Sequence, residues 1–132
     1  MKLQRIETPG IAHYAWLLAE GSEAMIVDPS RHVQKYLNAA RDLGTRITHI
    51  VETHRQEDFV MGSAWLAKRT GAKILNGNFD TFGHGDVRLE DGDTFCVGQL
   101  LIRAFHTPGH TPESMCYAVY EDKNAESAWA IF

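Results

Sequence analysis

The chain has 132 residues, of which 44% are hydrophobic, and a net charge of −4. This composition is typical of a compact, ordered domain rather than of a disordered segment. Acidic and basic residues are interspersed, with no basic run and no basic helix face, which argues against a nucleic-acid-binding stripe and a polybasic membrane anchor. We therefore expect no nucleic acid, no membrane and no acidic macromolecule among the partners.

The two cysteines, Cys96 and Cys116, form no C-x-x-C pair. Each lies in an apolar, strand-like run, where a free cysteine behaves as a small hydrophobic residue. The first residues lack the apolar core of a secretory signal, and no segment has the apolar length that a membrane span needs. The predicted location is the reducing cytoplasm.

The first half of the chain alternates between strands and helices. Alternating and apolar runs predict strands at residues 2–7, 12–20, 24–27 and 46–52. Ser30 is expected to cap a helix that ends at Gly44, and a second helix is expected from Asp58 to Thr70, closed by Gly71. The side chains that this second helix is expected to bury are Val60, Ala64, Trp65 and either Ala67 or Leu66.

The second half is rich in β-structure. From Lys73 onward, glycines and Asn-Gly or Asp-Gly pairs separate short strands, and longer strands are predicted at residues 100–105, 114–120 and 128–132. The last strand ends without a polar tail, so we expect the chain to stop inside a longer domain. Helices on a mixed sheet need a further layer, and 132 residues supply about half of such a sandwich.

Two segments carry residue types that bind metals. His54 follows a predicted strand and Asp58 lies four residues later, so both can face the crevice outside a strand end. His110 lies in a Pro-Gly turn, which fixes the direction of its imidazole. Together the three predict a metal site. Each residue also has an alternative role when it is considered alone. Asp58 could cap a helix, and a histidine at a strand end could simply form a hydrogen bond at the surface.

The other histidines are not expected to bind metal. His106 precedes His110 by four residues, but the intervening Pro-Gly excludes a helix, so it is interpreted as a strand-end residue. The remaining four lack ligand types at ligand spacing and are assigned structural or solvent roles. They are His13, His32, His49 and His84.

These motifs resemble the metallo-β-lactamase-fold proteins of the glyoxalase II and persulfide dioxygenase branch. That family carries T-H-x-H-x-D-H, a later T-P-G-H-T turn and then a Gly-Asp whose carboxylate completes the metal site. The matching residues are Asp28 and Pro29 of a D-P turn, Thr53, His54 and Asp58 of the first motif, and Thr107–Thr111 of the second. The resemblance implies an α/β fold, an αββα sandwich, with residues 1–132 forming one domain that is incomplete at its C-terminal end.

The first motif departs from the family pattern at two positions. Gln56 stands where the family has its second histidine, and Phe59 where it has the histidine after the aspartate. A glutamine offers only a weak neutral oxygen, and a phenylalanine offers no ligand atom. The resemblance therefore implies one metal ion rather than the two of a dinuclear zinc hydrolase.

The histidines that remain match the ligands of single-iron persulfide dioxygenases of this fold. They are His54 and His110, with the third ligand, a carboxylate, expected beyond Phe132. Such a ligand set leaves open positions for O2 and substrate, as in non-haem Fe(II) oxygenases. The resemblance thus implies one divalent metal, with Fe(II) favoured over Zn(II), and oxidation of a small persulfide such as glutathione persulfide to sulfite and a thiol.

Roles for neighbouring residues follow from the same resemblance. Asp58 is expected to be catalytic, either orienting a metal ligand or water or serving as a substitute ligand. Arg55 and Gln56 are expected to contact an anionic substrate. Glu113 replaces a small residue of the family and adds negative charge at the site. The resemblance also implies a rhodanese domain as a partner in a longer chain. Because the last apolar strand needs cover, we expect further chain or a second copy of the protein to cover it.

Two alternatives remain open at this stage. The first is a thioester hydrolase of glyoxalase II type with a single zinc, which would polarise a carbonyl and activate a water molecule. The second is a catalytically inactive binding module in which the changes at Gln56 and Phe59 removed the reaction. Metal content separates the three functions.

Overall fold

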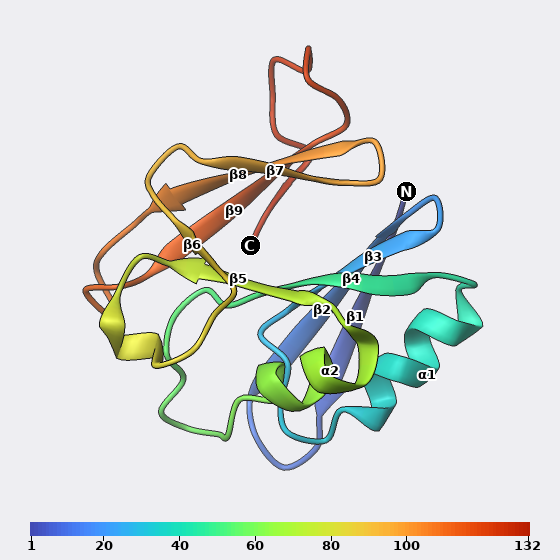
Figure 1. The fold of residues 1–132 in the computed structure, drawn as a ribbon, viewed down its shortest axis with the longest axis vertical. Helices are drawn as coiled ribbons and strands as arrows, with labels where there is room; N and C mark the ends of the chain where they lie inside the picture. Colours follow the sequence, from blue (N-terminus) through green and yellow to red (C-terminus); the bar gives the residue numbers. More distant parts are fainter.

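The computed structural model describes residues 1–132 as two β-sheets and a pair of α-helices stacked in layers (Figure 1). The first sheet contains β1 (Lys2–Thr8), β2 (His13–Glu20), β3 (Glu23–Val27), β4 (Arg46–Val51), β5 (Lys73–Gly77) and β6 (Val87–Leu89). The helices are α1 (Gln34–Asp42), α2 (Ser63–Thr70) and the 3-10 turn η1 (Asp80–Phe82). None of them is long and apolar enough to cross a lipid bilayer.

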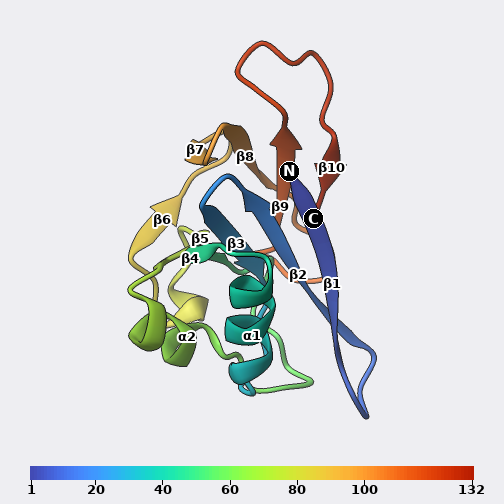
Figure 2. The same cartoon turned by 90° about the vertical axis from the view of Figure 1, so that its right-hand side faces the viewer.

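The strands of the first sheet lie in sequence order. β1, β2 and β3 pair antiparallel, whereas β3, β4, β5 and β6 pair parallel. Parallel neighbours need a crossover connection, and α1 and α2 supply the crossovers from β3 to β4 and from β4 to β5. Both helices cover the same face of the sheet (Figures 1 and 2).

The second sheet is antiparallel and covers the other face of the first (Figure 2). Its strands are β7 (Thr94–Val97), β8 (Leu100–His106), β9 (Met115–Tyr120) and β10 (Ala130–Ile131). The predicted last strand, at residues 128–132, is thus reduced to two residues. This arrangement confirms the predicted α/β class and gives the α, β and β layers of the expected sandwich.

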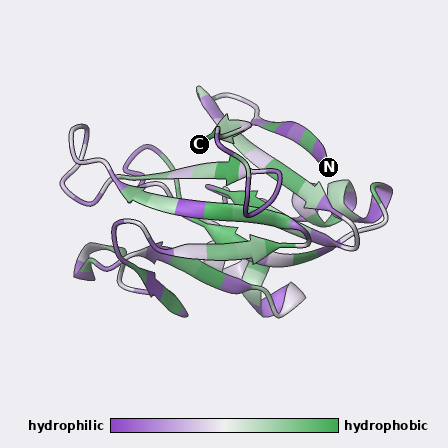
Figure 3. Ribbon diagram, turned by 90° about the horizontal axis from the view of Figure 1, so that it is seen from above, coloured by the Kyte–Doolittle hydropathy of each residue, from purple (hydrophilic) through white to green (hydrophobic).

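The central strands are apolar on both sides because each of their faces is covered. Leu17 and Ile26 point into the core under the helices, while Leu18 and Met25 point into the core between the sheets. Strands buried on both faces read as nearly continuous hydrophobic runs. Figure 3 shows this as green strands in the interior and purple loops at the periphery.

The first helix begins later than the sequence predicts. Ser30 was expected to cap it, but the residue at the N-cap position is Val33. The Ser30 hydroxyl instead lies 3.1 Å from the hydroxyl of Tyr36 and 3.2 Å from that of Thr8. A buried polar network therefore takes up the group that would have capped the helix. The helix ends before Gly44, as predicted, where φ is 69°.

The second helix also begins later, at Ser63 rather than Asp58. The preceding residues pair with the chain after β3: the N–H of Arg31 donates to the carbonyl of Val60 over 3.0 Å, and Ser30 forms an antiparallel bridge with Met61. This pairing keeps the segment extended.

The predicted set of buried side chains around this helix is partly wrong. Leu66 is buried, but Val60 and Trp65 are 53% and 51% exposed, and Ala64 is also exposed. The shortened helix turns Leu66, not Trp65, toward the sheet.

The bridge between these segments predicts a sensitive glycine. A Cβ at Gly62 would lie 2.2 Å from the carbonyl oxygen of Ser30, which is backbone and cannot rotate away. We expect Gly62→Ala to lower the free energy of unfolding by about 1–3 kcal/mol, as overpacking does. Gly109→Ala, which would meet no atom within 4 Å, is the control. Equal denaturation midpoints for the two variants would contradict the prediction.

Candidate metal centre

The candidate site lies where three segments meet. Asp28 follows β3, His54 follows β4, and His110 lies in the connection between β8 and β9. The backbone N–H of Met115 donates to the carbonyl of Thr53 over 2.7 Å, which joins the second sheet to the first at this point. The site thus occupies the C-terminal ends of parallel strands, as the sequence predicts.

Asp28 is a buried carboxylate that fixes the start of the metal-binding motif. One of its oxygens accepts the backbone N–H of Thr53 over 2.8 Å, and the other accepts the Thr53 hydroxyl over 2.6 Å. Its backbone has φ 48°, a left-handed conformation, and its carbonyl lies 2.9 Å from Nε2 of His13. Asp28 therefore ties β2, β3 and the end of β4 together.

The same contacts hold the ring of His54. Its Nδ1 lies 2.9 Å from the Thr53 hydroxyl oxygen. That hydroxyl donates its hydrogen to Asp28, so its oxygen is free to accept from Nδ1. The amide nitrogen of Gln56 lies 3.3 Å from the same ring nitrogen. Nε2 is the ring nitrogen that neither residue contacts, and a neutral imidazole nitrogen is a common metal ligand.

The two predicted metal ligands come together in space. The ring centroids of His54 and His110 are 5.1 Å apart, at an interplanar angle of 82°. Imidazoles bound to one ion, each with a nitrogen about 2.1 Å from it, place their ring centres roughly 4.5–5.5 Å apart. The observed separation of the ring centres lies in this range. No third His, Cys, Asp or Glu joins the pair within residues 1–132.

The electrostatics of the pair favour a neutral ligand. Burial lowers the pKa of His54, the neighbouring His110 lowers it further, and the charge of Glu113 opposes this only in part. His54 is half-buried, whereas His110 is exposed on its turn. A lowered pKa keeps the His54 lone pair available at neutral pH.

Asp58 and Phe59 lie away from this pair. Asp58 is exposed and lines hollows beside Ile11 and Phe59 rather than the one next to the pair, so it is not a substitute ligand in this structure. Its predicted catalytic role stays a prediction. The Phe59 ring packs on the His13 ring with centroids 4.0 Å apart, so the position of the missing family histidine holds an apolar contact. His13 has the structural role that the sequence predicts.

The predicted substrate-binding residues line one polar hollow. Arg55 and Gln56 form it together with Glu113, Thr81 and the turn after His110, and it contains no hydrophobic side chain. The Arg55 guanidinium donates to the carbonyl of Thr81 over 3.3 Å. Neither His54 nor His110 is among the residues that line it. Gln56 also lines a second hollow together with Asp58, so it lies between Arg55 and Asp58.

Glu113 connects the two loops of the site. Its carboxylate is buried and accepts the backbone N–H of Arg55 over 3.3 Å. Burial alone raises the pKa of Glu113, but the N–H groups of Glu113 and Arg55 and the Thr111 hydroxyl outweigh it, so the pKa is lowered. The negative charge expected here is therefore present, but it is directed at the neighbouring loop.

One polar cluster was missed by the sequence analysis. Glu52, which is 1% exposed, lies 2.7 Å from Nε2 of His84 and accepts from the Asn76 amide over 3.0 Å. The Tyr117 hydroxyl donates to the Glu52 carbonyl over 2.8 Å. His84 thus pairs with a residue 32 positions earlier. The only sequence signal for this cluster was the charged Glu52 directly after the apolar strand β4. Its partners come from other elements, so the sequence did not indicate them.

Asp28 predicts a pH dependence of stability. Burial raises its pKa from 3.8 to about 7, while Thr53 lowers it and Glu52 raises it. Between pH 4 and 7, Asp28 loses its proton in the unfolded chain but keeps it when folded, so its contribution to stability falls as pH rises through this window.

Asp28→Asn removes that titration, and asparagine tolerates the left-handed backbone. We expect the free energy of unfolding of the wild type, relative to the variant, to fall by up to about 4 kcal/mol between pH 4 and 7. Urea denaturation at several pH values measures this. Parallel curves for the two proteins would contradict it.

Comparison with known proteins agrees with this geometry. The family model of the metallo-beta-lactamase superfamily matches residues 8–125. The hydroxyacylglutathione hydrolase of Pseudomonas aeruginosa is 35% identical over 109 residues, which are 80% of this chain and 42% of the hydrolase. The corresponding enzyme of Acidiphilium cryptum is 33% identical over 107 residues, covering 80% of this chain and 44% of that enzyme.

Solved structures share the fold. ETHE1 from Myxococcus xanthus superposes with a TM-score of 0.82 at 26% identity, over 90% of this chain and 54% of ETHE1. A metallo-beta-lactamase from Staphylococcus aureus superposes with a TM-score of 0.90 at 29% identity, over all of this chain and 42% of that protein. The chain therefore spans about half or less of the relatives it matches. With the family model, the sheet order and the paired histidines in agreement, the chain belongs to the metallo-beta-lactamase superfamily.

Proposed function

We propose that the protein is a mononuclear non-haem iron enzyme that oxidises a small persulfide, resembling persulfide dioxygenase. The observation that carries this proposal is the imidazole pair of His54 and His110, without a second ligand cluster beside it. Gln56 and Phe59 occupy the positions at which a dinuclear hydrolase needs histidines. The likeness to ETHE1 supports the same branch of the superfamily.

The ligand set would be completed by a carboxylate from outside residues 1–132. When bound, Fe(II) would supply the electrons that O2 activation needs and open coordination positions for O2 and a sulfur atom. The overall reaction balances: one persulfide, one O2 and one water give one thiol, one sulfite and two protons. The outer sulfur is oxidised, O2 is reduced, and the inner sulfur stays with its carrier as the thiol.

The residues of this chain would bind the substrate and hold the ligands in place. Asp28, acting through Thr53, would hold the ring of His54 in position. Arg55, on the rim of the polar hollow, offers a cation to the carboxylates of a thiol carrier such as glutathione. Glu113 and Glu57 line the same hollow and disfavour an anion that approaches from their side.

The hydrolase relatives support a second candidate function, a thioester hydrolase with one zinc ion. Two relatives of this chain are hydroxyacylglutathione hydrolases. In that case zinc would polarise the thioester carbonyl and lower the pKa of a bound water molecule. The metal that copurifies and the substrate that is turned over distinguish the two functions.

The metal and the reaction can be tested together in the full-length protein. We expect close to one equivalent of iron by elemental analysis, and O2 uptake with glutathione persulfide in an oxygen electrode. His54→Ala and His110→Ala should each lower bound iron at least about tenfold, because each removes one of few ligands. His32→Ala, an exposed histidine outside the site, should keep both. Bound zinc together with turnover of S-lactoylglutathione would favour the hydrolase. A protein that binds no metal would favour the inactive binding module.

The two altered motif positions give an independent test of ligand number. Restoring both family histidines, by Gln56→His with Phe59→His, should raise the total metal bound by the full-length protein from about one to about two equivalents. Gln56→Ala with Phe59→Ala is the matched control and should stay at one. If the wild type already binds two equivalents, the single-metal assignment is wrong.

A further inference from the structure

The charges of this protein are mixed along the sequence but separated in space. Residues 30–46 and 63–73, which form both helices and the turns beside them, contain seven of the 13 Lys and Arg residues but only one of the 17 Asp and Glu residues. This layer has a formal charge of +6, and the other residues, with six cations and 16 anions, have −10. The basic helix face that the sequence analysis did not find is therefore present in the fold.

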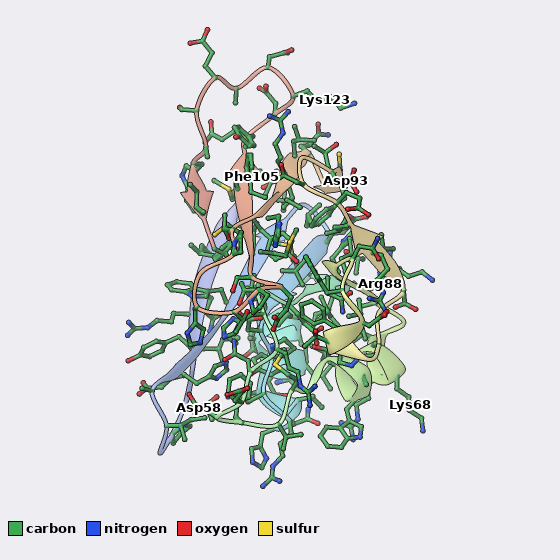
Figure 4. All side chains as sticks on the ribbon, turned by 90° about the vertical axis from the view of Figure 1, so that its left-hand side faces the viewer. Asp58, Lys68, Arg88, Asp93, Phe105 and Lys123 are labelled. Carbon is green, nitrogen blue, oxygen red and sulfur yellow. The ribbon has the colours of Figure 1, made fainter.

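Few groups neutralise this layer. Its one carboxylate, Asp42, pairs with Arg41 over 3.2 Å. The first turn of α1 has no acidic residue and no side-chain cap. Lys68 and Arg69 are exposed in the last turn of α2, and Figure 4 shows Lys68 pointing away from the body of the molecule.

A groove runs between the two helices, which lie side by side in Figures 1 and 2. One part of it lies between Arg31 at the start of α1 and the exposed side of α2. The other lies between the end of α1, where Arg41 is, and Arg46 at the start of β4. Arg69 borders both parts and donates to Gln34 of α1 over 3.0 Å, so this hydrogen bond divides the groove into two adjoining hollows, each with cations on its rim.

Apolar side chains contribute to both parts of the groove. Trp65 lies in the first part and is 51% exposed. Leu37 and Ile47 lie in the second, next to Ala40. Large exposed aromatic residues flanked by arginines are enriched at the energetic centres of protein interfaces. No residue of this groove belongs to the polar hollow beside His54 and His110.

The side chains of the groove favour one class of anionic partner over another. A single-stranded nucleic acid needs several aromatic platforms for its bases, and this groove has one indole followed by aliphatic side chains. An amphipathic polypeptide with acidic and aliphatic side chains matches both the apolar side chains and the cationic rims, in the manner of a helix in a groove. Its carboxylates would meet the arginines while its apolar side meets Trp65 and Leu37.

We propose that the groove between α1 and α2 is a docking site for an acidic, amphipathic segment of a partner protein. This revises the expectation that acidic macromolecules are absent from the partners. It is independent of the metal centre and of the reaction proposed for it. Binding would bring a partner to the helix layer while the hollow beside the two histidines stays open.

The test uses the full-length protein and a fluorescein-labelled 15-residue peptide of glutamate and leucine with helical spacing, followed by fluorescence anisotropy. We expect saturable binding that weakens as salt is raised. The double variant Lys68→Glu, Arg69→Glu should weaken it at least about tenfold, because it reverses two rim charges. The variant Arg103→Glu, Lys123→Glu makes the same change in net charge outside the groove and should bind like the wild type.

Trp65→Ala keeps every charge and removes an exposed side chain, so it provides a second test if charge reversal impairs folding. We expect it to weaken peptide binding about tenfold with an unchanged circular dichroism spectrum. Three results would overturn the proposal: no binding of the acidic peptide, equal loss in the Arg103 and Lys123 control, or tighter binding of a 15-nucleotide oligothymidylate or of anionic lipid vesicles through the same residues.

Discussion

The buried carboxylate of Asp28 is the constraint on which the metal centre depends. It ends β3 in a left-handed conformation and accepts both hydrogen-bond donors of Thr53, so it sets where the chain leaves β4. The ring of His54 is positioned from that point, because its Nδ1 lies against the Thr53 hydroxyl. A carboxylate is suited to this task because its two oxygens accept from the backbone and the side chain of one residue at once.

The ionised form of the Asp28 carboxylate is electrostatically unfavourable at this strand end. Burial and the nearby buried Glu52 both raise the pKa of Asp28. A cation bound by the two imidazoles would favour the ionised carboxylate, because an opposite charge nearby lowers the pKa of a carboxyl group. The fold therefore combines neutral ligands with anionic supports behind them, which is the usual organisation of a protein metal site.

The substitutions at Gln56 and Phe59 leave the contacts of Asp28 with Thr53 in place and change the contacts around them. Gln56 stays beside His54 as a hydrogen-bonding neighbour, whereas Phe59 has turned to the aromatic ring of His13. Glu113 links the two loops through the backbone of Arg55. The loops are thus held together by protein contacts.

The two functional surfaces lie on different layers and differ in character. The hollow beside the histidines is polar and lies between loops, while the groove between the helices contains apolar side chains and has cationic rims. The architecture of the first sheet explains why these two surfaces are separate. Its strand ends carry the candidate metal ligands. The crossover helices bury one side against the sheet and leave the other side free for charged residues.

The sequence alone determined the order of strands and helices, the α/β class, and the two histidines that meet. Local signals sufficed for these features. The spacing of hydrophobic residues predicted the strands, the Pro-Gly turn predicted the placement of His110, and the end of a strand predicted the placement of His54. Helix starts were set instead by tertiary contacts, because Ser30 hydrogen-bonds within a buried network and the segment before Ser63 pairs with another loop. The pairing of Glu52 with His84, the linkage of loops by Glu113 and the gathering of cations on one layer were likewise decided only by the fold. Each joins residues far apart in the chain, and local patterns carry no information about which distant side chains share a space.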